Sequence, residues 1–233
     1  FEHKENVVER IIKKLEDLKN TKVEEQPPLP IENNVLKTFS IENEPVVELV
    51  NNREREYIFA DLPDIGYSTD IDTVMASSYQ VKKQLQQIVK IEQPITNTLL
   101  YKRILRIWNL TRVTTRLQVF IDNLLEDAYK DPLSGDTIIY WEDEEKAKDC
   151  DFYRINSKRD ILDIPILEVM SAARYAIEQQ ISMPTEDLKR LTSQLLGFSR
   201  KGNNLDMVTE QTIQLLIDQG IFSHANGMVS MNN

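Results

Sequence analysis

Basic and hydroxyl side chains concentrate in the middle of this chain, in a pattern that suits contact with a phosphate backbone. Residues 81–120 contain eight Lys or Arg and one acidic residue, Glu92, although the net charge of the 233 residues is −10. Such a local excess attracts phosphates, because screening limits the reach of distant acidic side chains. The candidate contacts are Lys102, Arg103, Arg106, Arg112, Thr114, Thr115 and Arg116.

A second group of candidate contacts lies later in the chain. Residues 152–233 carry eight basic and nine acidic side chains, so the local charge there is nearly balanced. Two alternatives apply to both groups: the basic side chains could pair with the abundant Asp and Glu on a solvated face, or the same surface could bind a protein. The second group consists of Lys189, Arg190, Arg200, Lys201 and Asn203.

Residue patterns typical of catalysis are absent from the sequence. It has no Gly-x-x-x-x-Gly-Lys phosphate loop and no Gly-x-Ser-x-Gly motif. The acidic run 142–145 followed by Lys146 resembles the end of a nuclease strand, but clustered carboxylates without His more often form a solvated loop. His3 and His224 lack companions at ligand spacing, so we expect neither a metal nor a cofactor. We therefore predict that the chain is not an enzyme.

The single cysteine and the hydropathy pattern bear on the compartment. Cys150 has no internal partner for a disulfide, which favours a reducing, cytoplasmic environment. The sequence contains no run of about 18 apolar residues, so we expect no transmembrane helix and no membrane partner.

Two sets of three helices, each followed by a hairpin, are expected to position the candidate contacts. Apolar side chains recur at helical spacing over three segments of the first set: one that starts at Ser77 or Ser78 and is interrupted at Pro94, one at about 97–108 and one at about 113–128. A very short strand at Pro94–Ile95 separates the first two helices, and Thr137–Trp141 forms the closing strand. In the second set Pro184 opens the second helix, and the dipeptide Asn226–Gly227 predicts a tight hairpin turn.

The two sets match in order and in particular positions, which indicates an internal repeat. Asn109 and Gly197 each follow a second helix, and both residue types tolerate the positive φ of a helix stop. Three helices and a hairpin form a winged helix, in which the second and third helices make a helix-turn-helix. We therefore predict a mainly α fold with small β-hairpins, built from tandem winged-helix units at 77–155 and 160–233.

An N-terminal helix and an irregular extension are predicted to precede these units. Residues 3–20 show an amphipathic helical pattern, and a Pro-rich linker follows up to residue 30. Residues 31–76 are predicted to form an irregular extension, with short strands at Lys37–Ile41 and Tyr57–Ala60. Ser77 or Ser78 would cap the first helix of the first unit.

Three segments of the second unit carry a resemblance to a known family: Ile164-Pro165, Pro184-Thr185-Glu186-Asp187-Leu188 and Leu196-Gly197-Phe198-Ser199-Arg200-Lys201-Gly202. They are similar to a bacterial domain of unknown function found at the C-terminus of very large superfamily 1 DNA-helicase-like proteins. In those proteins a helicase core, and often a Vsr-like endonuclease domain, precedes the domain, and some members are associated with defence against foreign DNA. The resemblance is clearest over residues 160–223 and extends more weakly back to about 57. It implies upstream helicase or nuclease domains as partners, and no catalytic residue of the family falls in the matched segment.

These observations predict a non-catalytic accessory module of a helicase-like protein, which binds or orients DNA through its first winged-helix unit. The alternative is a protein docking module that contacts the helicase or nuclease core and binds no nucleic acid.

Overall fold

The computed structural model describes residues 51–67, 69–131, 137–155 and 158–232. Four predicted features lie outside these residues: the N-terminal helix at 3–20, the Pro-rich linker, the strand at 37–41 and most of the turn at 131–136. The described chain is mainly helical with three small sheets, as the apolar periodicity predicted.

Residues 78–141, here named the first module, contain three helices and three short strands. Strand β2 follows the first helix directly, and the sheet order β2-β4-β3 places the last strand between the other two. Both pairings are antiparallel. The elements are α3 (Ser78–Glu92), β2 (Ile95–Thr96), α4 (Asn97–Ile107), α5 (Thr115–Leu124), β3 (Tyr129–Lys130) and β4 (Ile139–Trp141).

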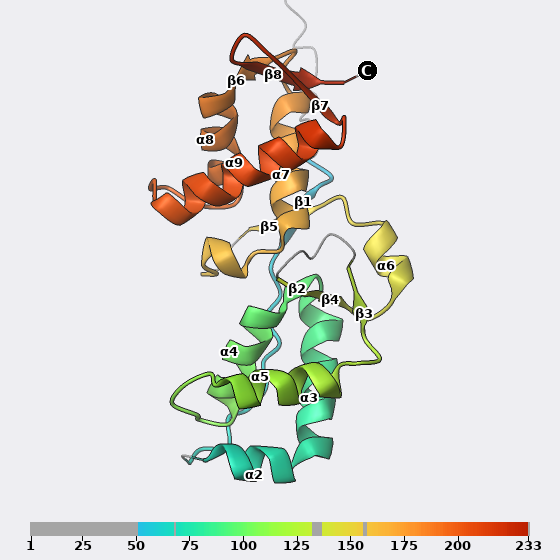
Figure 1. Ribbon diagram of the computed structural model, residues 1–233, viewed down its shortest axis with the longest axis vertical. Helices are drawn as coiled ribbons and strands as arrows, with labels where there is room; N and C mark the ends of the chain where they lie inside the picture. Colours follow the sequence, from blue (N-terminus) through green and yellow to red (C-terminus); the bar gives the residue numbers. More distant parts are fainter. Residues whose placement is uncertain (1–50, 68, 132–136, 156–157, 233) are drawn as a thin grey trace, which may run out of the picture. The chain divides into compact units, whose positions relative to one another are not determined.

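Residues 166–231, the second module, repeat this order of helices and strands. The sheet order is β6-β8-β7, again with the last strand in the centre and antiparallel pairing throughout (Figure 1). The elements are α7 (Ile166–Glu178), β6 (Met183–Pro184), α8 (Thr185–Leu195), α9 (Asn203–Asp218), β7 (Phe222–Ala225) and β8 (Met228–Met231).

Positive backbone φ angles occur where the sequence predicted them. The φ angles of Asn109 and Gly197, just after α4 and α8, are 47° and 89°. Asn226 and Gly227 join β7 to β8 with φ angles of 52° and 77°, the left-handed conformation that a two-residue hairpin turn requires. These local predictions are confirmed because each depends on the backbone preference of one or two residues.

Several predicted boundaries were wrong. The strand, β1, lies at Glu54–Glu56 and not at Tyr57–Ala60. It pairs in parallel with β5 (Tyr153–Ile155). The strand ends before Ala60 because the Ala60 N–H donates to Glu92, which draws the chain away from β5. A short helix, α2 (Ile71–Ala76), lies within the predicted extension, capped by Asp70. Helix α5 is shorter than 113–128, since the Thr114 hydroxyl accepts from the Leu117 N–H and fixes its start.

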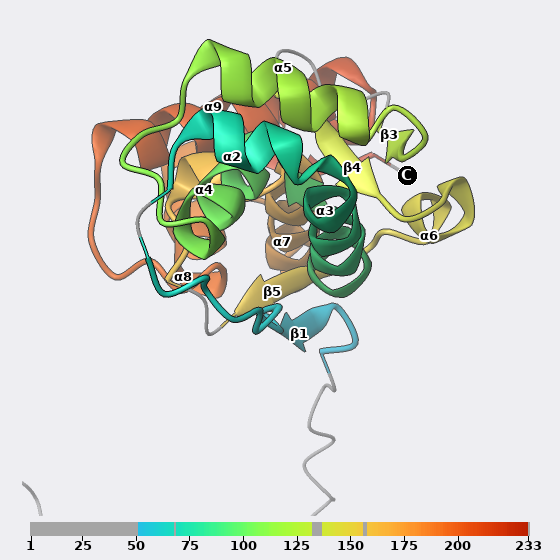
Figure 2. The same cartoon turned by 90° about the horizontal axis from the view of Figure 1, so that it is seen from below.

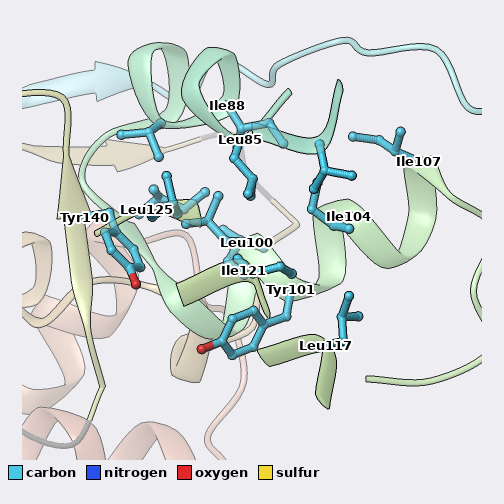
Figure 3. Packing of buried hydrophobic residues seen from close by; sticks show 14 of the residues in the cluster. Leu85, Ile88, Leu100, Tyr101, Ile104, Ile107, Leu117, Ile121, Leu125 and Tyr140 are labelled. Carbon is cyan, nitrogen blue, oxygen red and sulfur yellow. The ribbon is translucent and has the colours of Figure 1, made fainter. Parts of the chain in front are cut away.

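Apolar side chains of the three helices form a separate core in each module. In the first, Leu85, Ile104 and Ile121 are fully buried and converge from α3, α4 and α5 (Figure 3). In the second, Ala173, Leu188 and Leu216 come together in the same way from α7, α8 and α9. Trp108 belongs to the core of the first module and is 3% exposed, and Trp141 lies in a small cluster beside that core and is 1% exposed.

A buried ionic network joins the two modules through β5. The Arg154 guanidinium donates to the carbonyls of Glu92, Gln93 and Pro94 at 2.7, 3.1 and 2.6 Å, where helix α3 ends. The same group donates to Glu168 at 2.5 Å, in the first turn of α7, and Arg159 donates to Glu168 at 2.7 and 2.9 Å. Burial alone would raise the pKa of Glu168, but the charges of Arg154 and Arg159 outweigh it and hold this pKa below its ordinary value. The three side chains are 5%, 3% and 0% exposed, so each charge depends on the others for compensation.

The network makes Glu168 a residue whose loss should strongly destabilise the fold. Replacing it by Gln removes the buried carboxylate that both guanidinium groups contact, and we expect the free energy of unfolding to fall by about 3–5 kcal/mol. Urea denaturation at neutral pH measures the change. The control is Glu145→Gln on the exposed helix α6 (Glu144–Lys148), which should change stability by less than about 0.5 kcal/mol. Equal effects of the two substitutions would contradict the role given to the network.

Candidate nucleic-acid interface

Four candidate residues of the first group lie together, at the start of helix α5 and in the loop before it. Thr114 is the N-cap, so its hydroxyl is used by the helix itself. Thr115 and Arg116 occupy the first turn, and both side chains are exposed. Arg112 is exposed in the loop between α4 and α5. The start of α5 therefore combines free backbone N–H groups with two guanidinium groups, which is favourable for an anion.

Half of the eight basic side chains of residues 81–120 are paired with carboxylates among the described residues. Lys82 lies 3.1 Å from Asp127, and Lys102 lies 2.6 Å from Asp163. Arg116 lies 2.8 Å from Asp72 of α2, a helix that neighbours α5 in Figure 2. Arg103 lies 2.8 Å from Glu92. Three of these four carboxylates come from outside the basic segment, so the local sequence count overstates the free positive charge.

Arg103 is a structural residue rather than a candidate phosphate contact. Its side chain is 14% exposed, and its guanidinium donates to Glu92 and to the Tyr57 hydroxyl. The guanidinium carbon also lies 3.9 Å from the centre of the Phe59 ring. Releasing Arg103 toward a phosphate would leave the fully buried Glu92 carboxylate uncompensated. We therefore correct its assignment.

Lys102 pairs with Asp163, which lies in the short 3-10 helix η2 (Ile161–Asp163) just before the second module. That carboxylate is 7% exposed and accepts from Lys102 at 2.6 and 2.7 Å. The Lys102 side chain is nevertheless 56% exposed, so its ammonium group can approach a second partner.

Arg106 and Arg112, two candidate cations of the first group, have exposed side chains. Neither forms an ion pair with a described residue. Arg106 lies in the last turn of α4, where its guanidinium carbon is 5.5 Å from the centre of the Phe59 ring. Arg112 follows six residues later, beyond the αL residue Asn109. These two side chains can approach a phosphate without breaking a contact that the fold needs.

The second group is placed differently. Lys189 is 11% exposed and pairs with Glu186 at 3.3 Å, and Arg190 pairs with Asp187 at 2.7 Å. Arg200 and Lys201 are exposed in the turn between α8 and α9. Together with Lys189 and Arg190 they line a pocket of about 160 Å³, which Glu186 and Asp206 also line.

The two third helices also differ in charge. Asn203, at the start of α9, borders a shallow hollow whose other lining residues include Asp206 and Glu210. Acidic side chains along this side of α9 oppose the approach of phosphates. The exposed residues of α5 include no acidic side chain, because Asp122 is half-buried and accepts from the hydroxyls of Tyr101 and Tyr140.

The structure gives the acidic run at 142–145 a structural explanation. Asp143 caps α6, where Lys146 pairs with Glu142 and Lys148 lies 3.0 Å from Glu144. Within the described residues no group of three or more His, Cys, Asp or Glu is arranged to hold a metal ion. In the same part of the chain no helix is both long and apolar enough to cross a bilayer.

Sequence reasoning missed the acidic partners that occupy the candidate cations. Asp72 and Asp163 lie 44 and 61 residues away from Arg116 and Lys102 in the chain. The local sequence around either pair contains no signal for it, since a pair of this kind exists only after the elements have packed.

Comparison with known proteins gives one match. A family described as a protein of unknown function (DUF3320) matches residues 76–119, which contain α3, β2, α4 and the start of α5. The match lies in the first module, whereas the clearest resemblance was expected over residues 160–223. No curated protein and no solved structure gave a significant match.

Cys150 is expected to be an unreactive thiol. Burial raises its pKa to about 12, and the nearby Glu168 carboxylate adds to the increase. At pH 8 the thiolate fraction should be about 1000-fold lower than that of a free cysteine, so alkylation by iodoacetamide should be slower by a similar factor. Mass spectrometry of the native and the urea-unfolded chain measures the two rates. Equal rates would show that the thiol is not held in this buried environment.

Proposed function

We propose that both modules are winged helices and that the first binds duplex DNA through α5 and the loop before it. The order of helix, strand, two helices and two strands, with the last strand in the centre of the sheet, supports the winged-helix assignment. In this architecture the third helix enters the major groove, and neighbouring cations hold phosphates.

The single observation that carries the proposal is the exposed surface at the start of α5. Arg112, Thr115 and Arg116 are all exposed there, and Arg112 has no ion pair among the described residues. The exposed residues of α5 further along are the uncharged Val119 and Asn123, which suit the floor of a groove. Because α9 carries acidic side chains on its exposed side, we assign DNA contact to the first module and not to the second.

The broader proposal is that the chain is a non-catalytic accessory module of a helicase-like protein. The resemblance of the second module to domains at the C-terminus of such proteins supports it. The match of residues 76–119 to a family of unknown function is compatible with a place in a helicase-like protein, but it identifies no activity or partner. The second candidate function, protein docking without nucleic acid, is favoured by the ion pairs that neutralise Lys82, Lys102, Arg103 and Arg116 of the first module.

Charge reversal at the start of α5 tests the DNA proposal. Arg112→Glu combined with Arg116→Glu should lower the affinity for a duplex of about 20 base pairs by at least about 100-fold, because two phosphate contacts become repulsive. For the unmodified chain, the slope of log affinity against log salt should be steeper by about 2 than for a variant that loses both contacts. Fluorescence anisotropy at several salt concentrations gives both quantities.

The matched control reverses a paired cation in the second module. Arg190→Glu, at an exposed residue of α8, should change the affinity by less than about threefold, since that module makes no contact in the proposal. Salt-independent binding, or equal losses in the two variants, would sink the DNA proposal. Undetectable binding by the unmodified chain would favour the docking function instead.

Asp72 should act as a competitor for the DNA phosphate. Its carboxylate holds Arg116 in an ion pair whose two side chains are 57% and 74% exposed, so the pair contributes little to stability. Asp72→Asn should therefore raise the affinity for duplex DNA by about 3- to 10-fold while the melting temperature stays within a few degrees. Asp64→Asn, at an exposed residue of the preceding loop, removes the same charge without releasing Arg116. If both substitutions raise the affinity equally, the effect is one of net charge and Arg116 is not a contact.

A further inference from the structure

The cavity of the second module lies where α8, α9 and the turn between them meet. Its volume is about 160 Å³. Pockets that hold drug-sized ligands measure roughly 300–1,000 Å³, so this cavity suits a single small group. Its charged lining has an excess of two positive charges, with the four cations Lys189, Arg190, Arg200 and Lys201 and the two carboxylates Glu186 and Asp206.

The positive excess of this cavity comes from the turn. Arg200 and Lys201 are exposed, and neither forms an ion pair with a described residue. Arg190, by contrast, lies 2.7 Å from Asp187 on the same helix. The guanidinium of Arg200 and the ammonium of Lys201 are therefore available to an anion, and hydrogen bonds between charged partners are the stronger kind.

Lys189 supplies a buried cation with weak compensation. The whole residue is 9% exposed, and its ammonium lies 3.3 Å from Glu186 and 3.8 Å from Glu210. Both carboxylates are more than 70% exposed, so water screens their charge. An ammonium group has three protons to donate, and among the described residues this one makes a single side-chain hydrogen bond, of 3.3 Å. An anion in the cavity would give this buried charge a closer partner.

The start of α9 adds neutral donors beside these cations. Gly202 is the N-cap, and no described side chain caps the helix. A Cβ atom at Gly202 would meet nothing within 4 Å, so the first turn is open. Arg200 and Leu205 line both the cavity and an adjoining hollow that Gly202 and Asn203 border. The first N–H groups of a helix lack acceptors within it and favour a phosphate, which strengthens the case made by the cations.

The acidic side chains around the cavity restrict the kind of anion. Asp206 and Glu210 line a hollow along α9, and Asp187 lies on α8 beside Arg190. Such surroundings repel a nucleic-acid strand, which brings a further charge with every phosphate. A phosphorylated side chain carries about −1.5 to −2 charge at pH 7. That charge matches the excess of the cavity, and the residues that flank it in a protein can be neutral or basic.

We infer that this cavity binds a phosphoserine or phosphothreonine of a partner protein, with Arg200 and Lys201 as its main contacts and Lys189 as a buried counter-charge. The interaction is independent of DNA binding, which involves the first module. The second module would therefore have a separate role, which is to recognise a phosphorylated partner.

Two synthetic peptides that differ only in phosphorylation test the inference. Each contains about ten residues, alanine and lysine around a central serine or phosphoserine, and is titrated into the full chain by calorimetry. We expect the phosphorylated peptide to bind at least about tenfold more tightly, because only its dianion matches the charge of the cavity. Arg200→Ala combined with Lys201→Ala should remove this difference.

Two further variants keep the result interpretable. Lys83→Ala combined with Lys90→Ala removes the same two charges from exposed residues of α3, outside the cavity, and should leave the difference between the peptides unchanged. Asp206→Asn removes a carboxylate from the lining and should raise the affinity for the phosphorylated peptide by about 3- to 10-fold. A gain of this kind cannot result from a loss of folding.

Three results would overturn the inference. The first is equal binding of the two peptides up to about 1 mM. The second is equal behaviour of the two double variants. The third is a single-stranded oligonucleotide with a 5′-phosphate that binds more tightly than the peptide and loses this affinity in the Arg200→Ala, Lys201→Ala variant, since the cavity would then belong to a nucleic-acid end. Arg112→Glu with Arg116→Glu, which tests the DNA proposal, should leave peptide binding unchanged, so the two proposals can fail separately.

Discussion

The buried contact between Arg154, Arg159 and Glu168 is the interaction on which the arrangement of the two modules depends. The positive charge of Arg154 lies at the carboxyl end of α3, and the negative charge of Glu168 lies in the first turn of α7. Each charge has the sign that the dipole of its helix favours at that end, and the two side chains also pair with each other. Buried charges stabilise a structure only when every partner is present. The modules are consequently joined by a contact that tolerates little displacement, and β5, which carries Arg154, is more than a linker.

Charge pairing also decides what the first module can offer to a ligand. Of the candidate cations, Arg103 belongs to the fold, Lys102 and Arg116 share their charge with Asp163 and Asp72, and Arg106 and Arg112 retain exposed guanidinium groups. A DNA surface of this size would make few phosphate contacts, so its affinity would be modest and would fall with salt along a shallow slope. The two proposed functions, DNA binding and protein docking, therefore differ in what they require of these few side chains and not of the net charge of the chain.

Local features of the fold could be predicted from the sequence, whereas long-range features could not. The apolar spacing located α3, α4 and α9, and the Asn226–Gly227 pair located the last hairpin, because periodicity and turn chemistry act over a few residues. Helix α2 and strand β1 were missed because both are short and have weak local preferences. Strand β1 exists through its pairing with β5, about a hundred residues later in the chain.

By itself the sequence determined the three helices of each module, the αL stops after the second helices and the closing hairpins, since each follows from side-chain size and backbone preference. The tertiary structure alone decided which cations remain free and which sheet face is covered. Lys102 pairs with Asp163, and Ile166 packs against the apolar cluster of Ile139 and Trp141, only after distant parts of the chain have packed together. Ion pairing and burial depend on distances through space, and the local order of residues does not encode those distances.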